Sequence, residues 1–444
     1  MPFSKTPLGK ALVPALGAVL AWLSTAQAAP PPTSLAQALF DQGTFFLGFY
    51  YNGPAPLPSF RELRRLYQPQ LDQACASSKD RCGYEQAHRV LEDIIQKLGD
   101  PFTRFVSARE LEDARRYEQG LGPVAPRIGV WARETPKGLV VVESFPGEPA
   151  FEAGLRRGDL ITSLAGQPAT LARLEELEAL ATPRSGVTLA TPRSGGTAQN
   201  PFPLTYSRQG TSRSVNLTAR VAQESMQPRY ELLGKVAYLK VYHFYNSPQF
   251  SVAERVYEAA RRAESAGAKG MILDLRDALT GYDVEALLAA GAFIPKAGFI
   301  YDWRFQGLDE TVTLENGQVF SQREGQEREP ERAVPNPYQA KLPLVVLVNR
   351  YTVNSAEMLA YFLQAAGRAK VVGEPTAGAL GVSGDAEGPL ISGDFISVSS
   401  LRMRALDQTP FPLKVTPDVL LPEDLEALSR GRDLVLEKAL ELLK

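Results

Sequence analysis

Polar side chains able to do chemistry stand at the predicted start of a helix that follows an apolar strand. The run 344–348 predicts a buried strand, and residues 354–366 have helical spacing. Ser355 would be the first helical residue, where the positive end of the helix dipole favours developing negative charge, so its hydroxyl is a candidate nucleophile. Asn354 has no nucleophilic hydroxyl, but with Glu357 three residues later it fits a helix N-cap. Chemistry at Ser355 and capping at Asn354 are the two interpretations of this segment.

A serine nucleophile needs a general base, and the chain offers few. Its two histidines are His88, in a helical region with a surface pattern, and His243, which follows a predicted core strand. His243 either faces a cleft or is a hydrogen-bonded structural residue. Lys370 and Lys414 are possible substitutes for the base, but their default interpretation is that of solvated surface lysines. A lysine base would need its pKa lowered by burial or by neighbours. Two histidines also argue against a His-rich metal site, and we predict no metal and no cofactor.

Charge and the N-terminus limit the partners and the compartment. With 48 basic and 50 acidic residues, the net charge of −2 gives no basic face for nucleic acid. Lys5 and Lys10, the apolar stretch 11–23 and the small-residue triplet 26–28 form a secretory signal. The stretch is shorter than the roughly 20 residues that span a bilayer. We predict a signal peptide over 1–28 and an exported protein (periplasmic, cell-envelope or secreted) without an integral span; the alternative is an uncleaved anchor.

The cysteines are consistent with export. Cys75 and Cys82 are the only two in the chain. In an oxidising compartment, two cysteines close in sequence most simply form one local disulfide, and the alternative is a pair of unlinked thiols. Neither lies near a histidine or another activating motif, which disfavours a thiol nucleophile.

The remaining pattern divides the chain into three parts. Residues 29–118 are mostly helical, and residues 119–222 change to short strands. Residues 227–444 alternate strand and helix, which predicts an α/β core with a largely parallel inner sheet. The predicted fold class is therefore an α/β multidomain protein with an N-terminal helical region, a small β-rich α+β domain and an α/β core.

The middle part resembles a PDZ domain. The segments that carry this resemblance are 127–130, 138–159 and 161–166. A PDZ domain adds a peptide as an extra strand at an open sheet edge. The resemblance implies that the backbone N–H groups of Ile128, Gly129 and Val130 receive a terminal carboxylate, because exposed amides form an anion-binding nest. Gly129 would permit close approach of the ligand; alternatively it is an ordinary turn glycine and the module is a spacer.

Most of the other segments resemble the C-terminal processing, or tail-specific, serine peptidases with their ClpP/crotonase-like core. The segments are LGDPFTRFVS at 98–107, GKVAYLKVY at 234–242, GMILDLRDALTG at 270–281, residues 343–379 and VTPDV at 415–419. The resemblance implies peptide-bond hydrolysis by a serine with a lysine base and a backbone oxyanion hole. It also implies polypeptide partners with free C-termini, presented by the PDZ domain.

Three positions depart from the family's pattern. The family serine stands three residues before the acidic residue of its helix, where this chain has Asn354, and the lysine after Thr-x-Gly is replaced by Ala379. The paired glycines after LDLR are reduced to Thr280 and the oxyanion-loop Gly281, and Thr280 adds a Cβ where positive φ could be needed. Two functions remain: an exported serine peptidase that uses Ser355 or a relocated base, or a pseudoprotease that binds peptides or partners. A scaffold with an idle groove is a third, weaker interpretation.

Overall fold

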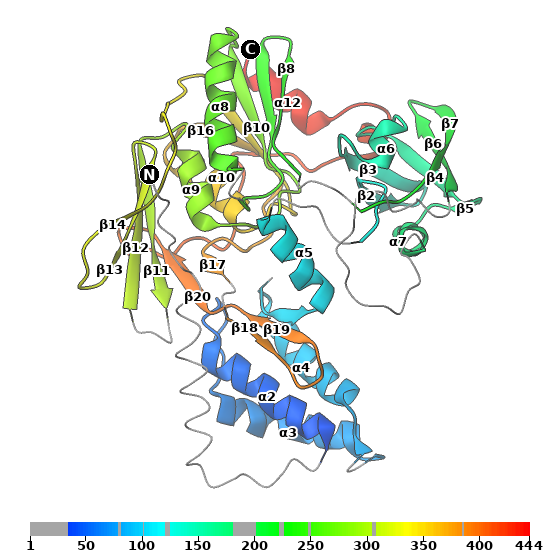
Figure 1. Ribbon diagram of the computed structural model, residues 1–444, viewed down its shortest axis with the longest axis vertical. Coiled ribbons are helices and arrows are strands. Elements are labelled where there is room, and N and C mark those ends of the chain that lie inside the picture. Colours follow the sequence, from blue (N-terminus) through cyan, green and yellow to red (C-terminus); the bar gives the residue numbers. More distant parts are fainter. Residues whose placement is uncertain are drawn as a thin grey trace.

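The computed structural model describes residues 34–78, 81–100, 102–119, 125–180, 201–221, 226–246, 250–303, 308–383 and 386–444. The predicted signal peptide lies outside these residues. Across the described ranges, no helix combines the length and the apolar character needed to cross a membrane. Figure 1 shows a helical base, a small β-rich domain to one side and a central core.

The helical base is built from amphipathic helices around one apolar cluster. Its elements are α2 (Leu35–Tyr50), α3 (Phe60–Cys75), α4 (Tyr84–Leu98), β1 (Arg104–Val106) and α5 (Ala108–Glu118). Helix α4 ends at Gly99, whose φ of 65° is the left-handed conformation that closes many helices. Strand β1 pairs with β19 (Phe395–Val398), which pairs with β18 (Ala386–Pro389), so a late segment returns to cover the helices (Figure 1). Ile396 and Val398 join the helical cluster.

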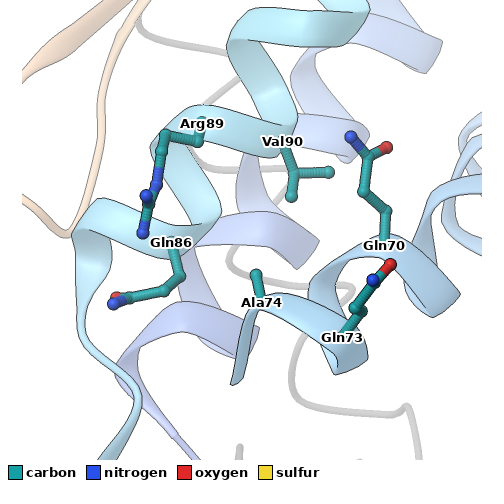
Figure 2. Close-up of a pocket in the computed structure, with 6 residues that line it drawn as sticks. All are labelled: Gln70, Gln73, Ala74, Gln86, Arg89 and Val90. Carbon is teal, nitrogen blue, oxygen red and sulfur yellow. The ribbon is translucent and has the colours of Figure 1, made fainter. Parts of the chain in front are cut away.

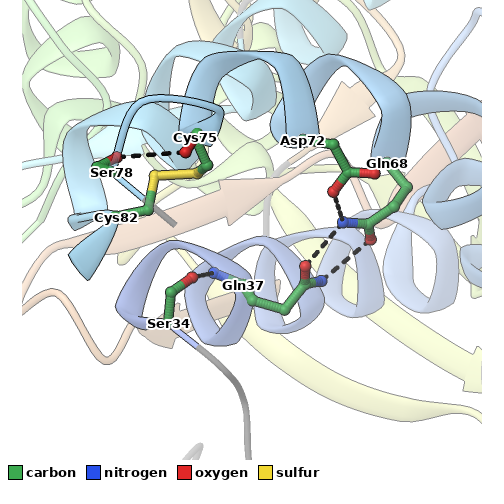
Figure 3. Close-up of a disulfide and its surroundings, with 7 residues drawn as sticks. All are labelled: Ser34, Gln37, Gln68, Asp72, Cys75, Ser78 and Cys82. Carbon is green, nitrogen blue, oxygen red and sulfur yellow. Dashed lines mark hydrogen bonds between the residues drawn. A yellow bond between two sulfur atoms is a disulfide. The ribbon is translucent and has the colours of Figure 1, made fainter. Parts of the chain in front are cut away.

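A disulfide closes the connection between α3 and α4 (Figure 3). Cys75 and Cys82 are bonded, with their Cα atoms 5.4 Å apart. The carbonyl of Cys82 accepts from the N–H of Ala36 at 3.1 Å, which ties the closed loop to the start of α2. Ser34 caps that helix by accepting from the N–H of Gln37 at 3.2 Å.

The β-rich domain is an antiparallel sheet in the order β2-β3-β4-β6-β7, with β2 at one edge. Its strands are β2 (Val130–Thr135), β3 (Gly138–Ser144), β4 (Leu160–Leu164), β5 (Gln167–Pro168), β6 (Phe202–Arg208) and β7 (Thr211–Leu217). Its helices are α6 (Pro149–Glu152) and α7 (Leu171–Ala179). Helix α7 contacts β2, and Leu174 and Leu177 fill the core beneath it.

The central core holds two six-stranded sheets. The first is ordered β21-β16-β15-β10-β9-β8, in which all neighbours are parallel except β8 and β9. Its strands are β8 (Arg229–Leu233), β9 (Val236–Lys240), β10 (Gly270–Asp274), β15 (Leu344–Val348), β16 (Ala369–Gly373) and β21 (Val419–Leu420). Strand β15 is buried along its whole length, as an apolar strand covered on both faces should be.

The second core sheet is antiparallel, in the order β14-β13-β12-β11-β20-β17. Its strands are β11 (Lys296–Trp303), β12 (Leu308–Glu315), β13 (Gln318–Arg323), β14 (Glu329–Ala333), β17 (Val382–Ser383) and β20 (Leu401–Arg404). The core helices are α8 (Val252–Ser265), α9 (Asp283–Ala290), α10 (Ser355–Ala365), α11 (Leu425–Ser429) and α12 (Leu434–Leu442). Helices α8, α9 and α10 share one apolar cluster with residues of both sheets, so α9 is buried except at the half-buried Val284.

The β-rich domain is docked on the core through its β3 face. Val140 and Val142 pack against Leu428 of α11. Arg157 extends the contact with charge by reaching Glu423 and Asp433, the latter at 3.0 Å. The domain that carries the predicted peptide groove is thus tied to the C-terminal segment of the core.

Candidate functional site

Asn354 occupies the N-cap of α10 in an uncommon backbone conformation, with φ 48° and ψ −106°. Its N–H donates to Glu357 Oε2 at 2.7 Å, which is the reciprocal bond of a capping box. Its side chain also reaches beyond the helix, because Nδ2 donates to the carbonyl of Val382 at 3.0 Å and Oδ1 accepts from Thr280 Oγ1 at 2.8 Å. Asn354 therefore joins the helix, the loop after β10 and strand β17.

Ser355 is completely buried at the first position of α10. Its Oγ lies 2.9 Å from the carbonyl oxygen of Gly281, 2.9 Å from Asn354 Oδ1 and 3.2 Å from Asp283 Oδ1. All three neighbours are acceptors, so the hydroxyl acts as a donor with one proton to share. The carboxylate of Asp283 also accepts from Tyr301 Oη at 3.2 Å. Ser355 is within reach of one carboxylate but closed off from solvent.

The loop after β10 is shaped by close packing on Phe244. The N–H of Phe244 donates to the carbonyl of Thr280 at 3.2 Å, and the N–H of Tyr282 donates back to Phe244 at 3.1 Å. A Cβ on Gly281 would lie 2.2 Å from the Phe244 backbone, so close approach requires this glycine. The positive φ considered for Thr280 occurs instead at Asp277, with φ 59°. The left-handed backbone of this loop is therefore at Asp277, near the end of β10, and not at Thr280.

Glu357 links the start of α10 to the loop that contains Ala379. Its carboxylate is fully buried and accepts from the N–H of Gly378 at 3.0 Å, the N–H of Ala379 at 2.9 Å and the hydroxyl of Thr376, besides the N–H of Asn354. Burial raises the pKa of Glu357, and these hydrogen bonds oppose the shift. Ala379 is itself buried, and its side chain is a methyl group, so this position offers no amine. The sequence indicated Glu357 as a capping residue, but its bonds to a loop some twenty residues later carry no local signal.

The candidate bases lie elsewhere. His243 is buried, its Nδ1 accepts from the N–H of Tyr245 at 3.1 Å, and burial lowers its pKa to about 4. His88 pairs with Asp394 at 3.0 Å in the helical base. Lys370 and Lys414 are exposed. The structure brings Asn354, Ser355 and Gly281 together, and it leaves these four candidate bases outside the hydrogen bonds of Ser355.

The predicted peptide groove lies along β2, beside α7. Ile128 and Gly129 are buried and Val130 is half-buried. Gly129 has φ 79°, and a Cβ there would lie 2.1 Å from Glu148 Cβ, so the position requires glycine for two reasons. The N–H of Ile128 already donates to Glu178 Oε1 of α7 at 2.8 Å. Glu178 has no motif position, so nothing in the sequence singles it out.

Comparison with known proteins identifies the core. Residues 235–421 match the model of peptidase family S41. A carboxyl-terminal-processing protease of Synechocystis is 28% identical over 296 residues, which cover 66% of this chain and 61% of the relative. The core of this chain is therefore similar to the C-terminal processing peptidases.

Further comparisons agree on the family and the fold. The carboxy-terminal processing protease CtpA of Bacillus subtilis is 24% identical over 291 residues, covering 65% of this chain and 54% of that protein. A putative S41 protease from Bacteroides fragilis matches 91% of this chain and 96% of its own with a TM-score of 0.54 and 16% identity, which shows a shared fold. The chain thus spans only 54–61% of the length of these two curated relatives.

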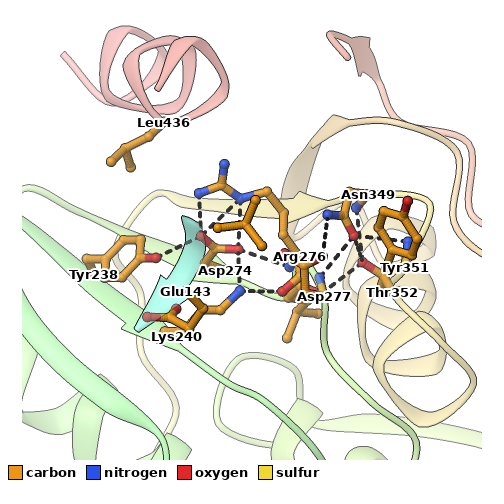
Figure 4. A network of polar contacts seen from close by, with 12 residues as sticks. Glu143, Tyr238, Lys240, Asp274, Arg276, Asp277, Asn349, Tyr351, Thr352 and Leu436 are labelled. Atoms are coloured by element: carbon orange, nitrogen blue, oxygen red, sulfur yellow. Dashed lines mark hydrogen bonds and ion pairs between the residues drawn. The ribbon is translucent and has the colours of Figure 1, made fainter. Parts of the chain in front are cut away.

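Within the family region, the end of β10 carries a buried ionic network (Figure 4). Asp274 accepts from Tyr238 Oη at 2.7 Å, Lys240 Nζ at 3.3 Å and the Arg276 guanidinium at 2.6–3.1 Å. Burial raises the pKa of Asp274, but the charges of Arg276 and Lys240 outweigh it and hold the pKa below its ordinary value. Arg276 also reaches Asp433 at 2.9 Å. Lys240 was not singled out from the sequence, and its bonds make it a structural lysine.

A second set of contacts positions the loop after β10 against the loop before α10 (Figure 4). The N–H of Asp277 donates to Asn349 Oδ1 at 2.9 Å, and Asn349 Nδ2 returns a bond to Asp277 Oδ1 at 3.1 Å. Thr352 Oγ1 donates to the carbonyl of Leu275 at 2.8 Å. Both loops that meet at Asn354 are therefore fixed by side-chain bonds behind the site.

The helical base has a hollow of its own (Figure 2). It lies between α3 and α4, has a volume of about 390 Å³ and is lined by Gln70, Gln73, Ala74, Gln86, Arg89 and Val90. None of these residues belongs to the core elements that carry Asn354 and Ser355. The hollow is therefore separate from the candidate site.

Proposed function

We propose that this protein is a non-hydrolytic member of its family that binds polypeptide C-termini through its PDZ-like domain. The observation that carries the proposal is the engagement of Asn354 at the family's nucleophile position. An amide replaces the hydroxyl there, and both ends of that amide are bound within the protein. No cofactor is required for such a role. The signal-like N-terminus supports an exported location.

The loss of hydrolysis is supported by the neighbouring positions as well. At the family's lysine position Ala379 offers only a methyl group. The backbone N–H groups of Gly378 and Ala379 donate to the carboxylate of Glu357. At the oxyanion loop, the carbonyl oxygen of Gly281 faces Ser355. An oxyanion hole needs N–H donors directed at the developing charge, and a carbonyl oxygen would repel it.

Peptide binding is supported by the edge position of β2. An edge strand exposes unpaired N–H and C=O groups to which an extended chain can add. Helix α7 contacts this edge strand. The chain thus retains a surface suited to a polypeptide ligand although the residues for cleavage are changed.

One observation favours a second candidate, an active peptidase that uses Ser355. Its Oγ is 3.2 Å from Asp283 Oδ1, within the reach expected of a nucleophile and its base. An ordinary carboxylate is a weak base toward a serine hydroxyl, and Ser355 is fully buried. This candidate requires the site to open.

Cleavage of an unstructured polypeptide tail by the purified protein separates the two candidates. We expect no cleavage by the wild type or by Ser355→Ala. Asn354→Ser should also be inactive, because a serine without a base is a poor nucleophile near neutral pH. The double variant Asn354→Ser with Ala379→Lys restores both members of the family's pair and should gain partial activity. Cleavage by the wild type that Ser355→Ala abolishes would refute the proposal.

Binding is tested separately by calorimetry with peptides that end in apolar residues. A free carboxyl terminus should bind more tightly than its amidated form, because amidation removes the anion from the nest. Equal affinity of both forms would contradict recognition of the terminus.

A further inference from the structure

The amide expected to receive a ligand's carboxylate already holds a carboxylate of the protein itself. The N–H of Ile128 donates to Glu178 Oε1 at 2.8 Å. Glu178 is half-buried near the C-terminal end of α7, which lies beside β2 (Figure 1). Fifty residues separate the two partners, so the contact depends on the folded domain. Glu178 thus occupies the position where strand addition would place a terminal carboxylate.

The far end of α7 is also tied to β2. The N–H of Leu171, the first residue of the helix, donates to Glu134 Oε2 at 3.3 Å. Glu134 lies on β2 and is exposed, so this bond is weaker than the half-buried one at Glu178. Both contacts hold the helix against the edge strand. A peptide that enters between them must break the contact at Ile128 to reach the nest.

A second carboxylate makes simultaneous occupation unfavourable. Glu148 packs on Gly129, and a Cβ built on that glycine would lie 3.3 Å from Glu148 Oε2. Burial raises the pKa of Glu148 although the charge of Arg220 opposes the shift, so burial disfavours negative charge at Glu148. A ligand carboxylate would add a third anion if Glu178 stayed in place. Ligand and Glu178 must therefore compete for the same amide.

We propose that Glu178 masks the peptide groove as an internal substitute for a ligand terminus and sets which ligands can enter. The inference rests on the proposed function. The ligand class is a polypeptide end with a free carboxylate, because that group replaces the bond that Glu178 gives up. A segment without a terminal anion would break the contact at Ile128 without replacing it. Glu178 is a specificity residue and takes no part in chemistry.

The test compares Glu178→Ala with Glu175→Ala by calorimetry on the full chain, using one peptide as free acid and as amide. Glu175 is exposed on the same helix, so its variant makes the same change of charge and size away from the nest. Removing a competing charge-assisted bond should tighten free-acid binding by about tenfold in Glu178→Ala. The amidated peptide should gain less, because it feels less repulsion from the carboxylate. Glu175→Ala should bind like the wild type.

The outcomes are distinguishable. If the wild type binds the free acid and Glu178→Ala binds no tighter, the masking inference is wrong while the proposed function stands. If neither the wild type nor either variant binds any peptide, the proposed function fails and the inference fails with it. Hydrogen exchange gives a reading without ligand, since the Ile128 amide should exchange faster in Glu178→Ala than in Glu175→Ala. Unchanged protection of that amide would also overturn the inference.

Discussion

Replacing Glu357 by glutamine tests whether its carboxylate holds the two halves of the site together. The carboxylate accepts from three backbone N–H groups and one hydroxyl, and it is fully buried. Glutamine keeps one acceptor oxygen and replaces the other with an NH₂ group, so two of the four donors lose their acceptor. An unsatisfied buried donor costs about 1–3 kcal/mol. Relief of the buried charge offsets part of this, and we expect a net destabilisation of about 3 kcal/mol.

The assay is denaturant unfolding of the full chain, followed by a probe of the core domain. Glu258→Gln is the matched control, because Glu258 is exposed and pairs with Arg255 one helical turn away. Such a surface pair contributes about 0.5 kcal/mol or less. If Glu357→Gln is as stable as the control, the four bonds contribute nothing that glutamine cannot replace. The assignment of Glu357 as the link between α10 and the loop at Ala379 would then be wrong.

Three other predictions concern stability. Cys75→Ser with Cys82→Ser should lower the free energy of unfolding of the helical base by about 2 kcal/mol, because the disulfide closes a short loop, and unfolding with and without the bond measures it. The pKa of His243 is about 4 in the fold against 6.5 ordinarily. The folded state therefore loses about 3 kcal/mol of its free energy of unfolding as the pH falls from 6.5 through 4. His243→Gln should not show this loss in a pH profile of unfolding. Ser355→Ala should cost about 1 kcal/mol, because it leaves the carbonyl of Gly281 without this donor, and a cost near zero would show that the hydroxyl bond is not formed.

The fold was predictable where its signal is local. The apolar run at 344–348 has the bounds of β15, and the alternation after residue 227 predicts the strands and helices of the core. Boundaries were less accurate where an apolar run outlasts its helix. Helical spacing alone predicts a helix over residues 283–293, whereas α9 ends at Ala290. Periodicity detects which face is apolar and does not detect where a helix ends.

The sequence indicated which residues of the candidate site lie close together but not their bonds, and their catalytic roles stay predictions. Motif spacing placed Asn354, Ser355 and Gly281 together, and the structure joins them through hydrogen bonds. Spacing could not show that Ser355 is fully buried, because burial depends on elements far away in sequence. The same holds for Lys240. The sequence indicates only that it lies on a strand, and its ion pair with Asp274 is seen only in the folded structure. Polar contacts across the fold leave no periodic pattern.

The backbone and side-chain bonds of Asn354 show how this fold accommodates an amide where the related peptidases have a serine. Asn354 combines φ 48° with ψ −106°, which lies outside the left-handed helical region that asparagine adopts readily, so its backbone is strained. Catalytic positions often store such strain, which the surrounding structure must offset. Here the amide of Asn354 gains bonds to Thr280 and Val382. If the proposed function is right, these two bonds let Asn354 connect the loops of the core at a position where the related peptidases need a free hydroxyl.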